Sequence, residues 1–205
     1  MSAIIYEKTA NGLYPTGQRS VSTYPSGLIR VDQTFVCRTS AAATHRAALA
    51  VGANMPGDST PAIDGLKIFP EPQERKRDDS FTEFIVSAYG RVNNTGRTTF
   101  EWNTFSESGT LKTNIGTANE QRASVTAILK NKTKKVEKVV PASEINNLVF
   151  DESGATTPVK INGMYGNVGG SYWSIGVTSY QSTNFGSFLE ITYIVGAYKL
   201  ASVGS

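Results

Sequence analysis

The sequence predicts an all-β protein, an antiparallel β-sandwich or open barrel with long loops and at most one short helix. Several runs alternate apolar with polar residues, and this period of two places successive side chains on opposite faces of a strand. The composition, with 19 Gly and many Thr, Val, Ser and Tyr, favours strands and turns over helices. Turn residues separate the runs at short intervals, as in sandwiches and barrels.

The clearest alternation lies near the C-terminus, in two consecutive runs. In residues 171–178 every second residue from Trp173 is apolar, and in residues 189–197 every second residue from Leu189 is apolar. The polar segment 181–186, with Gly at its end, connects the two runs. This pattern predicts a β-hairpin with a longer loop, and its apolar faces need a second layer to cover them.

We expect an extended N-terminal arm over residues 1–27 and a single β-rich domain over residues 28–205. The arm contains two Tyr-Pro-x-Gly turn patterns, ten residues apart, and no sustained alternation. Its start carries an apolar cluster, Ile4, Ile5 and Tyr6, which is costly to leave in water. We therefore predict that these three residues contact a neighbouring subunit.

The predicted domain contains two strong strands in its first half. Residues 28–38 alternate, and Cys37 falls on their apolar face, which predicts a buried thiol. Residues 81–89 are apolar on both faces. That pattern predicts a central strand covered on both sides.

Residues 40–51, between these strands, favour the one helix. Ser40 is its expected N-cap, and Gly52 is expected to end it. An extended loop with small side chains fits the same residues equally well. Residues 52–73 are rich in Gly, Pro, Asp and Ser and predict a long loop with a brief strand at 66–69.

Residues 98–105 predict a further strand in which Phe100 and Trp102 point inward, followed by a polar loop over residues 106–120. The aromatic side chains are expected to fill the interior because they bury a large apolar area.

A Lys-rich tip is predicted between strands at 124–129 and 136–140. Five Lys against one Glu give the tip a charge of +4, so the rest of the chain sums to −1 against a total of +3. Lys commonly protects sheet edges against intermolecular pairing. Lys without Arg or interleaved aromatic residues is a weak signal for nucleic-acid recognition. We favour edge protection or a solvated tip over nucleic-acid binding.

The segment 74–79 contains three basic and three acidic residues, whose charges cancel. This pattern predicts a solvated loop tip or an ion-pairing contact with a neighbouring copy. The candidate subunit-interface residues in it are Arg75, Arg77, Asp78 and Asp79.

The sequence offers no constellation for catalysis or for a metal. Cys37 and His45 are the only Cys and His, too few for a zinc site, and His45 stands in an Ala-rich run with no acid nearby. The glycines of 163–170 precede a strand, whereas a phosphate loop precedes a helix. A carboxylate pair for glycoside hydrolysis would have to come from strand residues such as Glu101 and Glu190, which the pattern places toward solvent. We expect no enzymatic activity, no metal and no cofactor.

The chain shows no membrane or export signal. Its apolar runs fall short of the roughly 18 residues of a membrane helix, and its N-terminus lacks the charged start and apolar core of a signal peptide. A single Cys makes no internal disulfide. We expect no membrane partner and synthesis in a reducing cytoplasm.

The segments 64–73 and 81–91, DGLKIFPEPQ and FTEFIVSAYGR, resemble structural proteins encoded in the virion modules of tailed bacteriophages, those of the neck, tail or head surface. The resemblance implies repeated copies in a symmetric ring or shell, with arms reaching between copies. The expected function is a non-enzymatic structural component of the virion, above all of the neck or tail. Its expected partners are copies of itself and other virion proteins, and its expected place is the virion, after synthesis in the bacterial host cytoplasm.

A carbohydrate- or receptor-binding β-sandwich is the alternative function, with a host-surface glycan as its partner. Tyr180 and Phe185 flank Asn184 at the predicted hairpin loop, and these three are its candidate ligand-binding residues. The predicted inward positions of Trp102 and Trp173 argue against a sugar-binding platform.

Overall fold

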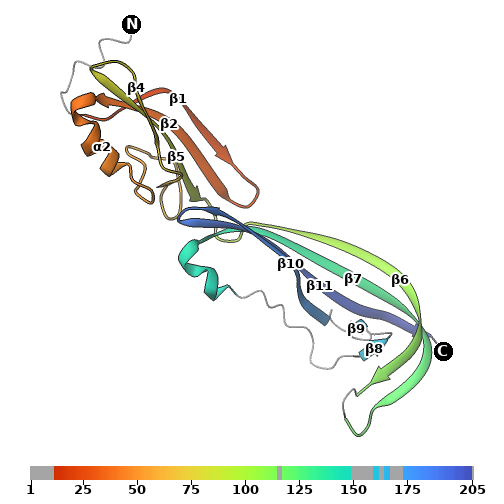
Figure 1. The fold of residues 1–205 in the computed structure, drawn as a ribbon. Helices are drawn as coiled ribbons and strands as arrows, with labels where there is room; N and C mark the ends of the chain where they lie inside the picture. The colour runs from red at the N-terminus through yellow and green to blue at the C-terminus, as the bar shows by residue number, and fades with distance from the viewer. Residues whose placement is uncertain (1–11, 115–116, 149–158, 162–163, 167–172, 205) are drawn as a thin grey trace. The chain divides into compact units, whose positions relative to one another are not determined.

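The computed structural model confirms an all-β, antiparallel fold (Figure 1). Most of the chain that it describes lies in strands, without a closed barrel, and the single α-helix of that part is the short α2 (Ala42–Ala48). The described residues are 12–114, 117–148, 159–161, 164–166 and 173–204.

The first sheet has β5 (Phe81–Arg91) at its centre. Its strand order is β1-β2-β5-β3, with β4 also paired to β5, and all of these pairs are antiparallel. The other bounds are β1 (Tyr14–Thr23), β2 (Leu28–Arg38), β3 (Lys67–Ile68) and β4 (Gln73–Lys76). The predicted central strand is therefore confirmed, and β2 has the predicted bounds.

The second sheet has the order β10-β11-β7-β6-β8-β9. Its strands are β6 (Arg97–Thr113), β7 (Gln121–Pro141), β8 (Val159–Ile161), β9 (Met164–Gly166), β10 (Trp173–Phe185) and β11 (Phe188–Gly204), and the 3-10 helix η2 (Ala142–Asn147) follows β7.

The predicted C-terminal hairpin is confirmed, but its connection is short. The polar residues 181–184 belong to β10, and the turn consists of Gly186 and Ser187. Gly186 has a φ of +70° and occupies the first central position, where two-residue hairpin turns favour Gly.

Strands β6 and β7 correct the sequence interpretation. Residues 106–113 of the predicted polar loop continue β6, and the predicted Lys-rich tip lies inside the uninterrupted strand β7. The chain reverses instead after Asn114, whose φ is +51°. Polar Ser, Thr and Lys residues are compatible with a strand wherever a face of an antiparallel sheet meets water, and pairing with neighbouring strands satisfies the backbone.

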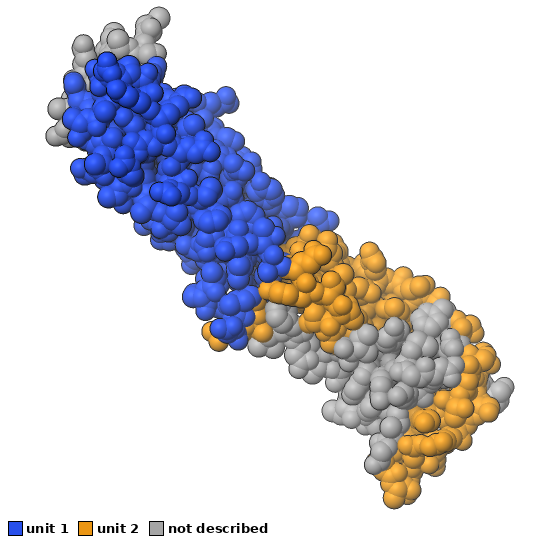
Figure 2. Space-filling model, viewed as in Figure 1, with its two compact units in different colours: residues 1–97, 138–146, 182–191 blue, residues 98–137, 147–181, 192–205 orange. Residues whose placement is uncertain are grey.

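The chain forms two compact units (Figure 2), neither of which coincides with an arm that ends at residue 27. Unit 1 comprises residues 1–97, 138–146 and 182–191, and unit 2 comprises residues 98–137, 147–181 and 192–205.

Part of the predicted N-terminal arm is a strand of the first sheet. Residues 14–23 form β1, which pairs with β2, and a register shift between Thr16 and Ser20 accommodates Gly17 at a φ of +71°. Pro15 is tolerated because β1 lies at the edge of the sheet. The predicted interface cluster Ile4, Ile5 and Tyr6 lies outside the described residues.

The core of unit 1 lies on one face of β2 and β5. Phe84 is 1% exposed and packs there with Phe35, which is directly opposite in the β2–β5 register. Loop and helix residues cover this face, among them Ala42, Leu49, Met55 and Leu66, and Ile68 of β3 joins the same cluster. The other face of β5 is covered less completely, since Tyr89 is buried but Ile85 is 37% exposed.

The helix is shorter than predicted and lacks the predicted cap. Ser40 lies in the preceding 3-10 turn η1 (Thr39–Ala41), and α2 begins after Ala41 without a side-chain cap. It ends before Gly52, whose N–H instead donates to the carbonyl of Ile68.

Cys37 is buried, as predicted, with 1% of its surface exposed. Burial raises the pKa of the Cys37 thiol, and the negative charge of Glu74 adds to this effect. We expect a thiol reagent at neutral pH to label the native protein at least about 100-fold more slowly than the urea-unfolded protein, because labelling requires local opening. Equal labelling rates in the two states would contradict the buried position.

Candidate functional site

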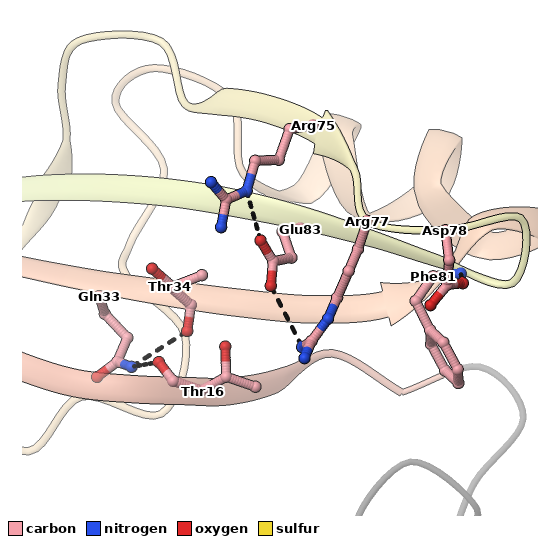
Figure 3. A network of polar contacts seen from close by, with 8 residues as sticks. All are labelled: Thr16, Gln33, Thr34, Arg75, Arg77, Asp78, Phe81 and Glu83. Atoms are coloured by element: carbon pink, nitrogen blue, oxygen red, sulfur yellow. Dashed lines mark hydrogen bonds and ion pairs between the residues drawn. The ribbon is translucent and has the colours of Figure 1, made fainter. Parts of the chain in front are cut away.

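The predicted subunit-interface charges form an ion-pair network within unit 1 (Figure 3). The Glu83 side chain, only 8% exposed, lies between Arg75 and Arg77. Its carboxylate accepts hydrogen bonds from Arg75 Nε at 2.5 Å and from Arg77 Nη1 at 3.3 Å. Because Glu83 is on β5, these contacts tie the end of β4 and the following residues back onto the centre of the sheet.

The acidic residues of the same segment also have partners within the chain. Asp78 Oδ1 accepts the backbone N–H groups of Ser80 and Phe81, each at 2.8 Å, and so closes the turn before β5. Asp79, 98% exposed, pairs with Lys76 at 2.6 Å. The segment therefore stabilises its own hairpin.

Two of the three candidate ligand-binding residues of the alternative function, Asn184 and Phe185, make structural contacts within unit 1. Phe185 packs on Tyr89, with their ring centroids 4.8 Å apart, and Asn184 Oδ1 accepts the turn N–H of Gly186 at 2.7 Å. Both belong to unit 1, whereas Tyr180, 42% exposed, belongs to unit 2. The aromatic ring expected at a loop tip is thus packed against the core of unit 1.

Unit 2 carries an exposed aromatic and basic cluster that the sequence interpretation missed. Phe100 is 47% exposed and Trp102 is 61% exposed, so their predicted inward orientation is wrong. Their ring centroids are 6.4 Å apart on β6. Lys132 Nζ, from β7, lies 4.4 Å from the centroid of Phe100 and 5.3 Å from that of Trp102, within reach of a cation–π interaction.

Alternation extends this cluster along β7. Lys130 and Lys134 stand two residues before and after Lys132 on the same strand, so they share its face. We call the five residues Phe100, Trp102, Lys130, Lys132 and Lys134 the aromatic–lysine surface.

Glu101 and Glu137 are separated from this surface. Both have odd numbers, whereas the surface residues have even numbers. The Ser108 and Thr126 hydroxyls, 3.3 Å apart, show that even-numbered residues of both strands share a face. Lys135 pairs with Glu137 at 3.3 Å on the opposite face.

The position of β7 also removes one explanation for its lysines. This strand lies between β11 and β6 in the sheet, so the lysines do not protect an edge, and they do not form a hairpin tip. The absence of Gly and Pro from residues 121–140 is the sequence signal that predicts one continuous strand here.

A hollow of about 290 Å³ in unit 1 has an ion pair, Arg46–Glu74, in its lining. Arg46 donates from Nε and Nη2 to the two carboxylate oxygens of Glu74, at 2.6 and 2.8 Å. The hydrogen bond from Arg46 lowers the pKa of Glu74. Because the two groups bond to each other, the pair links α2 to β4.

Within the described ranges, no three His, Cys, Asp or Glu side chains gather as a metal site. The one α-helix of that part is also far too short and polar to cross a bilayer.

The fold and the site define an all-β protein whose second sheet presents an exposed aromatic–lysine surface. No protein-family model, no curated protein and no solved structure matches this chain.

Proposed function

We propose that this protein is a non-enzymatic structural component of a bacteriophage virion, of the neck or tail, that assembles in multiple copies. The resemblance of residues 64–73 and 81–91 to virion proteins supplies the context. The observation that supports assembly is the outer edge of β10, which is the last strand of the second sheet. In the part of the chain that the structure describes, β11 is its only strand neighbour.

The residues of β10 carry neither the charges nor the Pro that commonly prevent intermolecular pairing at an edge. The 13 residues of β10 include no charged residue and no Pro. Gly176, with a φ of +82°, interrupts regular geometry once, and residues 177–181 after it are all exposed within unit 2. Proteins usually protect long edges with Lys, Pro or bulges because free backbone groups recruit other strands.

An uncharged edge of this kind favours strand addition from another subunit. Backbone hydrogen bonds then give affinity, and alternate side chains give specificity. Ser, Thr and Val side chains on β10 suit a paired strand, and pairing of two uncharged edges desolvates no charge. A second copy of the chain fits this requirement.

We expect the wild-type chain to form oligomers whose population rises with concentration, as measured by sedimentation velocity. The double variant Ser179→Lys/Gln181→Lys places two charges on the β10 edge and is expected to weaken self-association at least about tenfold, since unpaired charges at a paired edge cost more than 1.4 kcal/mol.

The matched control is Ser124→Lys/Ile128→Lys, which adds the same charge at exposed positions of the interior strand β7. This control is expected to associate as the wild type does. A monomeric wild type at all concentrations, or equal association of both double variants, would contradict assembly through β10.

The alternative glycan-binding function has less support. Phe185 and Asn184 are engaged by Tyr89 and Gly186, so two of its three candidate residues already have structural partners.

A further inference from the structure

We propose that the aromatic–lysine surface of β6 and β7 binds single-stranded nucleic acid. This proposal lies wholly within unit 2 and is independent of assembly at the β10 edge.

The two rings provide a stacking surface on the face of a sheet. Phe100 and Trp102 expose 47% and 61% of their surface, and a separation of 6.4 Å between centroids on alternate residues of one strand places them side by side. Unstacked bases bind such rings because every base has a π-face, so this contact tolerates different sequences.

The lysines provide a row of positive charge along the next strand. Alternate residues of a strand lie about 6.7 Å apart, so Lys130, Lys132 and Lys134 extend over about 13 Å. Lys132 stands within 5.3 Å of both ring centroids, which brings the charge and the stacking surface together. Glu101 and Glu137 have odd numbers, so alternation places them on the other face of β6 and β7 from these lysines.

This combination favours a single strand over the other anionic or stacking ligands. A duplex keeps its bases stacked inside, which would leave the exposed rings without a role. A neutral sugar carries no negative charge for the lysines to attract. A single strand offers phosphates to the lysines and free bases to the rings.

The test uses the full chain and a fluorescein-labelled oligothymidylate, with binding followed by fluorescence anisotropy. We expect measurable binding in which log K falls with log salt at a slope of about −2, since three phosphates neutralised contribute roughly −0.7 each. Lys132→Gln is expected to make this slope shallower by about 0.7.

Two further substitutions separate stacking from general attraction. Trp102→Ala is expected to weaken binding about 5- to 150-fold without changing the salt slope, and Trp102→Phe is expected to retain most of the affinity. Lys135→Gln removes the same charge from the opposite face of β7 and is expected to leave affinity near that of the wild type. Circular dichroism of each variant checks that the fold is kept.

Several results would overturn the proposal. These are absence of oligothymidylate binding, equal loss of affinity in Lys135→Gln and Lys132→Gln, or no effect of Trp102→Ala. Equal affinity for a duplex of the same length or for a sulfated polysaccharide would show general polyanion attraction and would likewise overturn it.

Discussion

Replacing Phe84 by Ala is expected to lower the free energy of unfolding of unit 1 by about 3–5 kcal/mol. Phe84 is 1% exposed at the centre of the β2–β5 face, and α2 and the following loop cover it. Removal of the ring loses its transfer free energy and leaves a cavity that backbone pairing on both sides of β5 prevents from collapsing.

Cys37 provides a readout that is specific to unit 1. It is the only Cys of the chain and packs in the same buried cluster as Phe84, whereas both Trp residues belong to unit 2. If the opening of unit 1 that exposes Cys37 is in rapid equilibrium, the thiol-labelling rate of Phe84→Ala should be about 150- to 4,000-fold higher than that of the wild type.

Ile85→Ala is the matched control, on the same strand and one residue away. Ile85 is 37% exposed on the other face of β5, so its truncation is expected to cost less than about 1.5 kcal/mol. Similar labelling rates for the two variants would show that the core of unit 1 does not lie on the Phe84 face.

The double variant Arg75→Gln/Arg77→Gln is expected to destabilise unit 1 by about 1–3 kcal/mol. Both guanidinium groups bond to Glu83, whose side chain is 8% exposed, and their loss leaves a buried carboxylate without cationic partners. The expected cost stays below that of a fully buried ion pair because Arg75 and Arg77 are themselves 66% and 41% exposed. Urea dependence of Cys37 labelling measures the change.

Lys76→Gln controls for loss of positive charge in the same segment. Lys76 pairs with the exposed Asp79, so its replacement is expected to cost no more than about 0.5 kcal/mol. Adding Glu83→Met to the Arg-free double variant should recover part of the lost stability, because an apolar side chain carries no desolvation penalty. If this triple variant is no more stable than the double variant, desolvation of Glu83 is not the cause.

Features that depend on local backbone geometry could be predicted from the sequence. Alternation with a period of two predicted β2 and the β10–β11 hairpin, because successive side chains of a strand point in opposite directions. A run that is apolar on both faces predicted the central strand β5. The alternation also predicted that Cys37 is buried. Cys37 lies at an odd-numbered position of β2, on the same face as the apolar residues Val31 and Phe35.

The aromatic–lysine surface could be recognised only in the tertiary structure. Phe100 and Lys132 are far apart in the sequence, and only the pairing of β6 with β7 brings a Lys over the aromatic rings. Alternation shows which residues share a face of a strand, but burial of that face depends on whether a second layer covers it. For this reason Trp102, which the sequence places on the interior side, is exposed in the structure.

The same limit applies to the edges of the sheets. A strand's own residues do not determine its neighbours, because hydrogen-bonding partners are chosen by contacts that form only when distant segments meet. The lysines of β7 therefore suggested edge protection although the strand is interior, and the uncharged strand β10 lies at the edge. Local patterning specified the strands of this protein, and long-range pairing decided which of their surfaces are left exposed.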